Sequence, residues 1–150
     1  MKMKRLILPL LTAVLFSACA STVSISEDVT SAEIIQRAQE AMDRNRFKAA
    51  TQLYQILHDR NRDNIDLMIT AEYHIAFIQY KQKKYNLARD GFNGVLDYYN
   101  SPDEVFLPQH FKRLSQIVLN TIEVKTNPVP RKSKLQERRE AREQVAAEIE

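Results

Sequence analysis

The chain has 150 residues, a formal net charge of +3 at pH 7 and a pI near 9.0, with one cysteine and two glycines. A single cysteine excludes an intramolecular disulfide and a Cys-rich zinc site, and two glycines argue against Gly-rich phosphate-binding loops and β-rich folds. The length favours one domain with a modest core, and the basic pI raises nucleic-acid binding as the first hypothesis to test.

The N-terminus has the pattern of a secretory signal peptide. Lys2, Lys4 and Arg5 precede an uncharged, mostly apolar run over residues 6–18. This run is too short to span a hydrocarbon core of about 30 Å at about 1.5 Å per helical residue, so we expect cleavage and not a transmembrane anchor. Loss of residues 1–18 removes three basic residues and no acidic one, leaving 19 of each and a formal charge of zero. The mature composition therefore does not favour a nucleic-acid partner.

The end of this run resembles the lipobox of bacterial lipoproteins, in which small residues precede a cysteine that is lipidated and becomes the mature N-terminus. Ser17, Ala18 and Cys19 match that pattern, whereas Phe16 stands where leucine is usual. The resemblance implies lipidation of Cys19, and at about 0.8 kcal/mol per buried CH₂ its acyl chains would hold the protein stably on a membrane. The alternative is ordinary cleavage near Ala18, which would leave a free thiol.

Residues 19–30 combine this cysteine with a segment rich in Ser and Thr, which we expect to be a flexible tether. Ala20 follows the cysteine in place of the Asp that retains lipoproteins at the inner membrane in enteric-type sorting. The resemblance therefore favours the cell envelope, at the periplasmic face of the outer membrane.

Beyond the tether the sequence predicts helices. Thr30 and Glu33 form a capping box that opens the first one. Apolar residues then recur at spacings of three and four, which predicts helices over residues 31–45, 47–59, 65–82 and 85–98. Ser101 to Glu104 is a further helix start, and we expect Pro108 to separate a short turn from a main helix that ends near Val124. Because no segment alternates apolar and polar residues, the predicted fold is all-α.

An internal repeat predicts how these helices are arranged. Shifting the chain by 38 residues superposes two helical hairpins, and the second helix of each carries an aromatic residue, then Ala three residues later, then another aromatic four residues beyond. These residues are Phe47, Ala50 and Tyr54 in the first repeat and Tyr85, Ala88 and Phe92 in the second. The pattern resembles the tetratricopeptide repeat (TPR), whose small first-helix residue is matched by Ala38 and Ala76.

The resemblance implies antiparallel hairpins stacked as a short TPR-like solenoid over residues 31–125, with a capping helix and, over residues 126–150, a Pro linker and a charged helical tail. The sequence departs from the family at Ile34 and Glu72, where the family has Trp, and its period exceeds the usual length of about 34 residues. A generic antiparallel bundle is the alternative. We expect the tail to be a solvated, marginal helix.

In TPR proteins the first helix of each hairpin lines a concave groove that holds a peptide or a partner helix. Carried over by position, the resemblance implies a partner-binding groove formed by Ile35, Gln39, Met42, Tyr73, Phe77, Tyr80 and Lys81. Three of these residues form one aromatic stripe along a helix that is apolar nearly all round. The alternative is that the capping helix or the tail covers these rings.

The sequence gives no sign of catalytic, metal or cofactor chemistry. Its three histidines, His58, His74 and His110, are far apart and outside any HExxH motif, and no nucleophile elbow is present. We therefore expect no enzyme. The competing class is a small hydrolase or metal-dependent enzyme that uses His74 or His110, which would require two carboxylates close to either ring. Gly91 and Gly94 lie inside a predicted helix at a cost of about 1 kcal/mol each, and we expect the segment after Pro102 to approach them.

Taken together, the sequence predicts a membrane-anchored extracytoplasmic lipoprotein that acts as a protein-binding scaffold or adaptor in an envelope complex. Its expected partner is another envelope protein or peptide. Accessory roles in outer-membrane protein assembly, or beside a transporter or a cell-wall enzyme, stay open as alternatives. A purely structural envelope lipoprotein without a specific partner is a further one.

Overall fold

The computed structural model describes residues 23–128 and, in the tail, Arg139, Arg142 and Ala147, which are helical. Residues 23–128 are all-α. Their helices are α2 (Ser31–Asp43), α3 (Phe47–Arg60), α4 (Ile65–Lys81), α5 (Tyr85–Asp97) and α6 (Gln109–Thr126), with two short 3₁₀ turns, η2 (Tyr98–Asn100) and η3 (Pro102–Phe106), between α5 and α6. The predicted signal peptide and Cys19 lie outside the described residues, as does most of the predicted tail.

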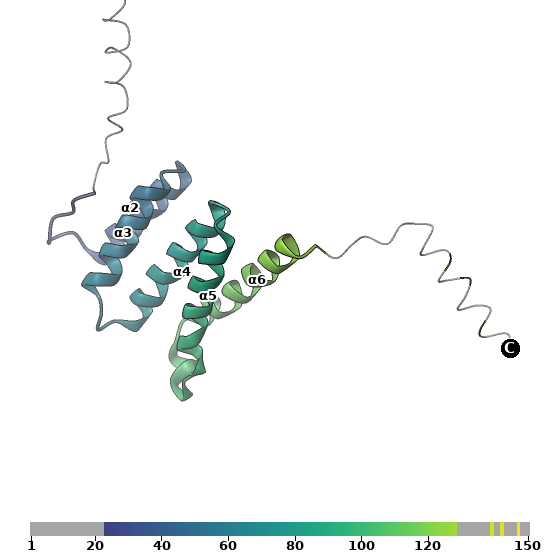
Figure 1. The fold of residues 1–150 in the computed structure, drawn as a ribbon. Helices are drawn as coiled ribbons and strands as arrows, with labels where there is room; N and C mark the ends of the chain where they lie inside the picture. The colour runs from purple at the N-terminus through teal and green to yellow at the C-terminus, as the bar shows by residue number, and fades with distance from the viewer. Residues whose placement is uncertain (1–22, 129–138, 140–141, 143–146, 148–150) are drawn as a thin grey trace, which may run out of the picture.

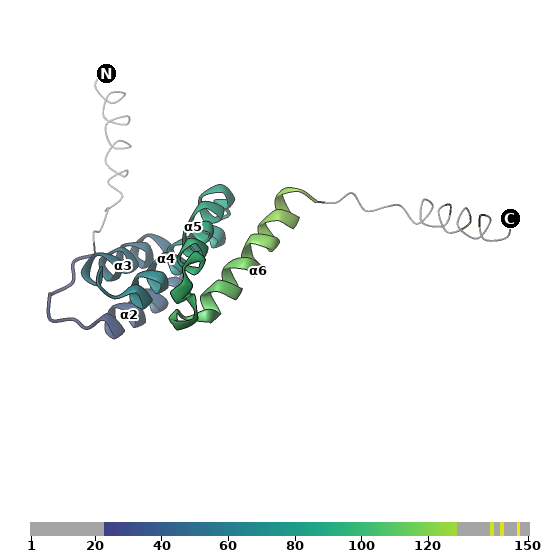
Figure 2. The same cartoon turned by 90° about the horizontal axis from the view of Figure 1, so that it is seen from below.

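The helices form stacked antiparallel hairpins, which confirms the predicted fold class. The hairpins α2–α3 and α4–α5 lie side by side through contacts between α3 and α4, and α6 packs on α5 and touches α4. Figure 2 shows α6 leaving the stack at an angle. Each of the four predicted helices ends within two residues of its expected position.

Local signals in the sequence fix where the helices begin. The Thr30 hydroxyl accepts a hydrogen bond from the Glu33 backbone N–H at 3.2 Å, as the capping box predicts. The Ser101 hydroxyl likewise accepts from the Asp103 N–H at 3.2 Å, but the segment it caps is the short η3. Helix α6 begins directly after Pro108, so the predicted division at this proline is confirmed.

The 38-residue period of the sequence recurs in the backbone. Asn45 and Lys83, 38 residues apart, both have positive φ angles, of 55° and 61°. Each follows the first helix of a hairpin, and the next residue donates its N–H to the carbonyl five residues back, with N···O distances of 2.8 and 2.9 Å. This is the hydrogen-bond pattern of a Schellman turn. Both hairpins therefore reverse direction through the same local geometry.

The core consists of two clusters that share α4. One cluster lies among α2, α3 and α4, and the other among α4, α5 and α6. Helix α4 supplies Ala71 and Ile78 to the first, and Ile69, Tyr73 and Ala76 to the second. Six of the eight residues predicted to pack the repeats are buried and the other two are partly buried; the buried ones are Ala38, Ala50, Tyr54, Ala76, Ala88 and Phe92, and the partly buried ones are Phe47 and Tyr85.

Helices α4 and α5 approach each other closely at Gly91. A Cβ atom added there would lie 2.8 Å from the Cβ of Ala76, whereas one added at Gly94 would meet nothing within 4 Å. The expectation that the segment after Pro102 approaches these glycines is therefore wrong. Gly91 makes room for α4, and Gly94 meets no such neighbour.

The two glycines give a matched test of this contact. Gly91→Ala should lower the free energy of unfolding by about 1–3 kcal/mol, because the added methyl group overlaps Ala76 in a packed core. Gly94→Ala, three residues along the same helix, should raise it by up to about 1 kcal/mol through helix propensity alone. Urea denaturation of both variants measures the difference. A stability gain in both would contradict the close approach of α4 and α5.

Candidate functional site

The outer face of α6 is an apolar surface that no described element covers. The inner face of the helix is buried against α4 and α5, through side chains that include Phe111 and Ile122. On the outer face Leu114, Ile117 and Val124 are 39%, 59% and 69% exposed. With Thr121 they form a stripe at spacings of three, four and three residues. Contiguous exposed apolar side chains of this kind mark interaction sites.

A groove of about 420 Å³ runs along this stripe. It is lined by Ile117, Asn120, Thr121, Val124 and Lys125. Its walls are mostly apolar, with an amide, a hydroxyl and an ammonium group as the polar members. The arrangement fits a partner that offers apolar side chains and a few hydrogen-bonding groups.

The aromatic stripe predicted as the groove lies beneath α6 instead. Tyr73 is 6% exposed, and its ring centroid is 4.8 Å from that of Phe111 and 5.6 Å from that of Phe92. Phe77 and Tyr80 are partly buried against the same cluster. The prediction that Tyr73 faces a partner is therefore wrong, because α6 covers this side of α4 and makes the stripe part of the core.

The other predicted groove residues do not form one open surface. Ile35 and Met42 on α2 are partly buried against the first cluster, while Gln39 and Lys81 are exposed. Sequence reasoning missed the outer face of α6. The signal was present in the regular spacing of Leu114 and its three neighbours on that face, but α6 carries two apolar stripes and periodicity alone does not say which one is covered.

Three polar contacts fasten the C-terminal half of α6 to the stack, one of which is a hydrogen bond of 3.3 Å from Arg89 to the Thr126 hydroxyl. The Lys125 ammonium donates to the Tyr80 hydroxyl at 2.9 Å and lies 4.9 Å from the centre of that ring. The hydrogen bond to Tyr80 raises the pKa of Lys125. An ion pair of 3.5 Å joins Arg89 on α5 to Glu123 on α6. These contacts hold α6 so that its outer face points away from the stack.

His74 lies where α3, α4 and α6 meet. Its ring stacks on that of Tyr54 with a centroid distance of 4.7 Å and an interplanar angle of 7°, and it meets Phe111 edge-on at 6.1 Å. Its Nδ1 atom is buried and has no hydrogen-bond partner among the described residues. Burial, and to a smaller extent the neighbouring charge of His110, lowers the pKa of His74 to about 4.

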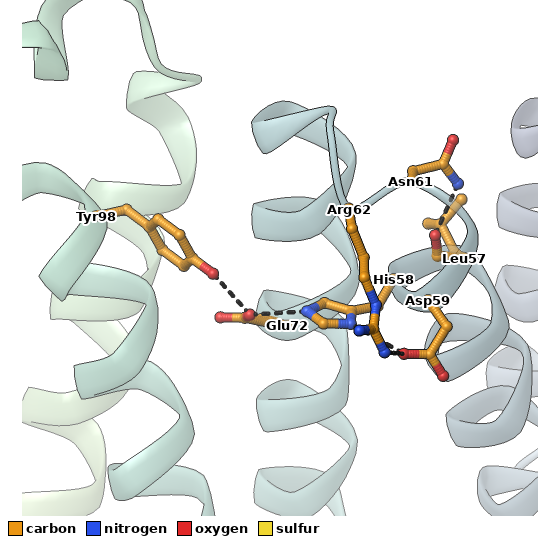
Figure 3. A network of polar contacts seen from close by, with 7 residues as sticks. All are labelled: Leu57, His58, Asp59, Asn61, Arg62, Glu72 and Tyr98. Carbon is orange, nitrogen blue, oxygen red and sulfur yellow. Dashed lines mark hydrogen bonds and ion pairs between the residues drawn. The ribbon is translucent and has the colours of Figure 1, made fainter.

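A network of polar contacts joins α3, α4 and η2 (Figure 3). One carboxylate oxygen of Glu72 lies 3.2 Å from Nε2 of His58 and accepts a hydrogen bond of 2.8 Å from the Tyr98 hydroxyl. Burial first, and then this hydrogen bond, raises the pKa of Tyr98 to about 12. Glu72 occupies in the second hairpin the place that Ile34 has in the first, so a polar contact here replaces an apolar one.

The enzyme alternative requires carboxylates beside His74 or His110. The carboxylates that lie close to a histidine ring, those of Glu72 and Asp59, are beside His58 instead. Asp59 is 3.5 Å from Nδ1 of His58 and 3.1 Å from Arg62, whose hydrogen bond is the main cause that lowers the pKa of Asp59. Among the described residues, no group of three His, Cys, Asp or Glu side chains is placed to hold a metal ion. The same part of the chain contains no helix with the length and apolarity needed to cross a membrane.

Comparisons with known proteins give one relative. A protein of Treponema pallidum (strain Nichols), called an uncharacterized protein, is 32% identical over 113 residues, which cover 73% of this chain and 45% of the relative. The chain thus spans less than half the length of that relative. No family model matches the sequence, and no solved structure matches it. The resemblances to lipoproteins and to TPR proteins stay predictions.

His74 makes the stability of the protein sensitive to acid. Its pKa of about 4 in the folded state lies below the ordinary value of 6.5, so between these values the unfolded state binds more protons. The free energy of unfolding should therefore fall by roughly 2–3 kcal/mol as the pH drops from about 6.5 to about 4. Below about pH 4 both states bind the proton, so the contribution of His74 should no longer change.

Urea denaturation of the wild type, His74→Phe and His58→Gln at several pH values tests this assignment. His74→Phe keeps an aromatic ring against Tyr54 and should abolish most of the fall between pH 6.5 and 4. His58→Gln is the control and should retain it. An unchanged pH profile in His74→Phe would show that His74 is not the group responsible.

Proposed function

We propose that this protein is a membrane-anchored extracytoplasmic lipoprotein whose helical domain is a protein-binding scaffold or adaptor in an envelope complex. The outer face of α6 carries the proposal. Its apolar side chains repeat at the spacing with which one helix packs against another, so an amphipathic helix of a partner fits this surface. The expected partner is another envelope protein or peptide.

The segment between the predicted lipid and the helices supports close attachment to the membrane. Residues 23–29 were expected to be a free tether, but Val23, Ile25 and Val29 pack against the first cluster. The Val23 N–H donates to the Gln52 side chain at 3.2 Å, and Arg60 donates to the carbonyls of Ile25 and Ser26 at 3.0 and 3.2 Å. The expectation of a free tether is therefore wrong for residues 23–29.

This docking limits how far the domain can stand from its anchor. Between Cys19 and Val23 the chain can extend by at most about 14 Å. A lipid on Cys19 would therefore hold the α2–α3 hairpin close to the bilayer surface. The second hairpin and α6, at the far side of the stack in Figure 1, would remain open to a partner.

Cys19→Ser tests the anchor. Loss of the only thiol in the chain should move the protein from the membrane fraction to the soluble fraction and abolish incorporation of radiolabelled fatty acid. Both readouts are taken from the same cells, with the wild-type chain as reference. A wild-type chain that takes up no label, or a variant that fractionates with the membrane as the wild type does, would overturn the lipoprotein assignment; the α6 surface is tested separately.

The α6 surface is tested by crosslinking in intact cells followed by purification of the tagged full chain. Ile117→Glu places a charge at the centre of the stripe and should reduce the recovery of crosslinked partners about tenfold or more, because the apolar contact is lost. As an exposed substitution it should change the free energy of unfolding by no more than about 0.5 kcal/mol. Ile65→Glu, an exposed isoleucine on α4, is the matched control and should keep the partners. Equal recovery from both variants would contradict the proposal.

A further inference from the structure

The connection between α5 and α6 exposes the two largest apolar side chains of η3. Val105 is 69% exposed and Phe106 is 81% exposed. In Figure 1 this connection extends past the ends of the neighbouring helices. A valine and a phenylalanine next to each other at such a tip form a projecting apolar knob, and we use "knob" for these two residues below.

The knob is held in place by the residues around it. The Tyr99 hydroxyl donates to the Pro108 carbonyl at 2.8 Å, which closes the base of the connection. Glu104, next to the knob, forms an ion pair with Lys112 on α6, and the ammonium group of Lys112 lies 5.7 Å from the centre of the Tyr99 ring. A connection fixed by several contacts loses little conformational entropy when its tip binds another surface.

Acidic residues lie close to the knob along the chain. Asp97 ends α5 and Asp103 precedes the knob by two residues, and neither has an ion-pair partner among the described residues. The charge of Glu104 is offset by Lys112. The connection that carries the knob, residues 98–108, thus contains two acidic residues and no basic one, which disfavours an anionic lipid surface and favours a pocket with a positive rim.

A pocket of that kind lies at the other end of the same pair of helices. It has a volume of about 330 Å³ and is lined by Lys83, Lys84, Tyr85, Asn86, Leu87 and Thr126. Lys83 and Lys84 are exposed, and the apolar part of the lining comes from Tyr85 and Leu87. Helix α5 begins at this pocket and ends before the knob, and α6 begins after the knob and ends at the pocket.

We propose that the knob of one copy of this chain inserts into this pocket of a second copy, so that the protein associates with itself head to tail. The Phe106 ring would fill the apolar part of the pocket, and Asp103 would face Lys83 and Lys84. Because knob and pocket are different surfaces at opposite ends, the contact is heterologous and builds rings or filaments. It leaves the outer face of α6 free and does not depend on the partner proposed for that face.

Mixing two complementary variants of the full chain tests this arrangement directly. Phe106→Asp removes the knob, and Lys84→Glu reverses a charge at the pocket rim; each alone should weaken self-association about tenfold or more in sedimentation velocity experiments on detergent-purified protein. Phe106→Asp keeps the pocket and Lys84→Glu keeps the knob, so a pair with one copy of each variant has one intact knob and one intact pocket. The mixture should form a one-to-one dimer and nothing larger, whereas the wild type forms higher oligomers as its concentration rises.

Two further arms separate the possible outcomes. Val124→Asp, on the outer face of α6, is the matched control and should associate like the wild type. A photoreactive p-benzoylphenylalanine in place of Phe106 should crosslink, in intact cells, to residues 83–87 of a second copy. A wild type that stays monomeric at every concentration, a mixture that fails to form dimers, or crosslinks to lipid or to another protein would each overturn the proposal.

Discussion

Helix α4 is apolar nearly all round, and the need to cover it on both sides determines the arrangement of the other helices. Each core cluster needs residues from it, with Ile78 packed toward α2 and α3 and Tyr73 packed toward α5 and α6. A helix of this kind is stable in water only if it is buried on every apolar side. The two core clusters therefore share one central helix.

This requirement explains why α6 lies where it does. Without it the rings of Tyr73, Phe77 and Tyr80 would face solvent along one side of α4. With it, Phe111 packs on Tyr73 and Lys125 reaches Tyr80, so the stripe becomes part of the second cluster. Because α6 covers the aromatic stripe of α4, the exposed apolar surface lies on α6, on the face that carries Leu114, Ile117 and Val124. The proposed partner surface is therefore on α6 and not on α4.

Helix positions and the repeat were predictable because they depend on neighbours in the sequence. The capping box at Thr30, the break at Pro108 and the aromatic pattern beginning at Phe47 are short-range signals, and they match the helices that form. The exposed face of α6 was not predictable, because periodicity defines two apolar stripes on a helix without saying which one a neighbour will cover. The role of Gly91 depends on its register against Ala76, which only the packed helices fix. The docking of residues 23–29 through Gln52 and Arg60 has no periodic signal at all.

The coupling between Tyr73 and Phe111 tests this account most directly, because it measures whether α6 covers α4 in solution. A double-mutant cycle with Tyr73→Leu, Phe111→Leu and the combined variant, followed by urea denaturation, isolates the energy of this contact from the effect of each substitution alone. If the rings pack as described, the coupling energy should be about 0.5–1.5 kcal/mol. Additive effects, with a coupling energy near zero, would show that α6 does not cover the aromatic stripe and would return Tyr73, Phe77 and Tyr80 to an open groove.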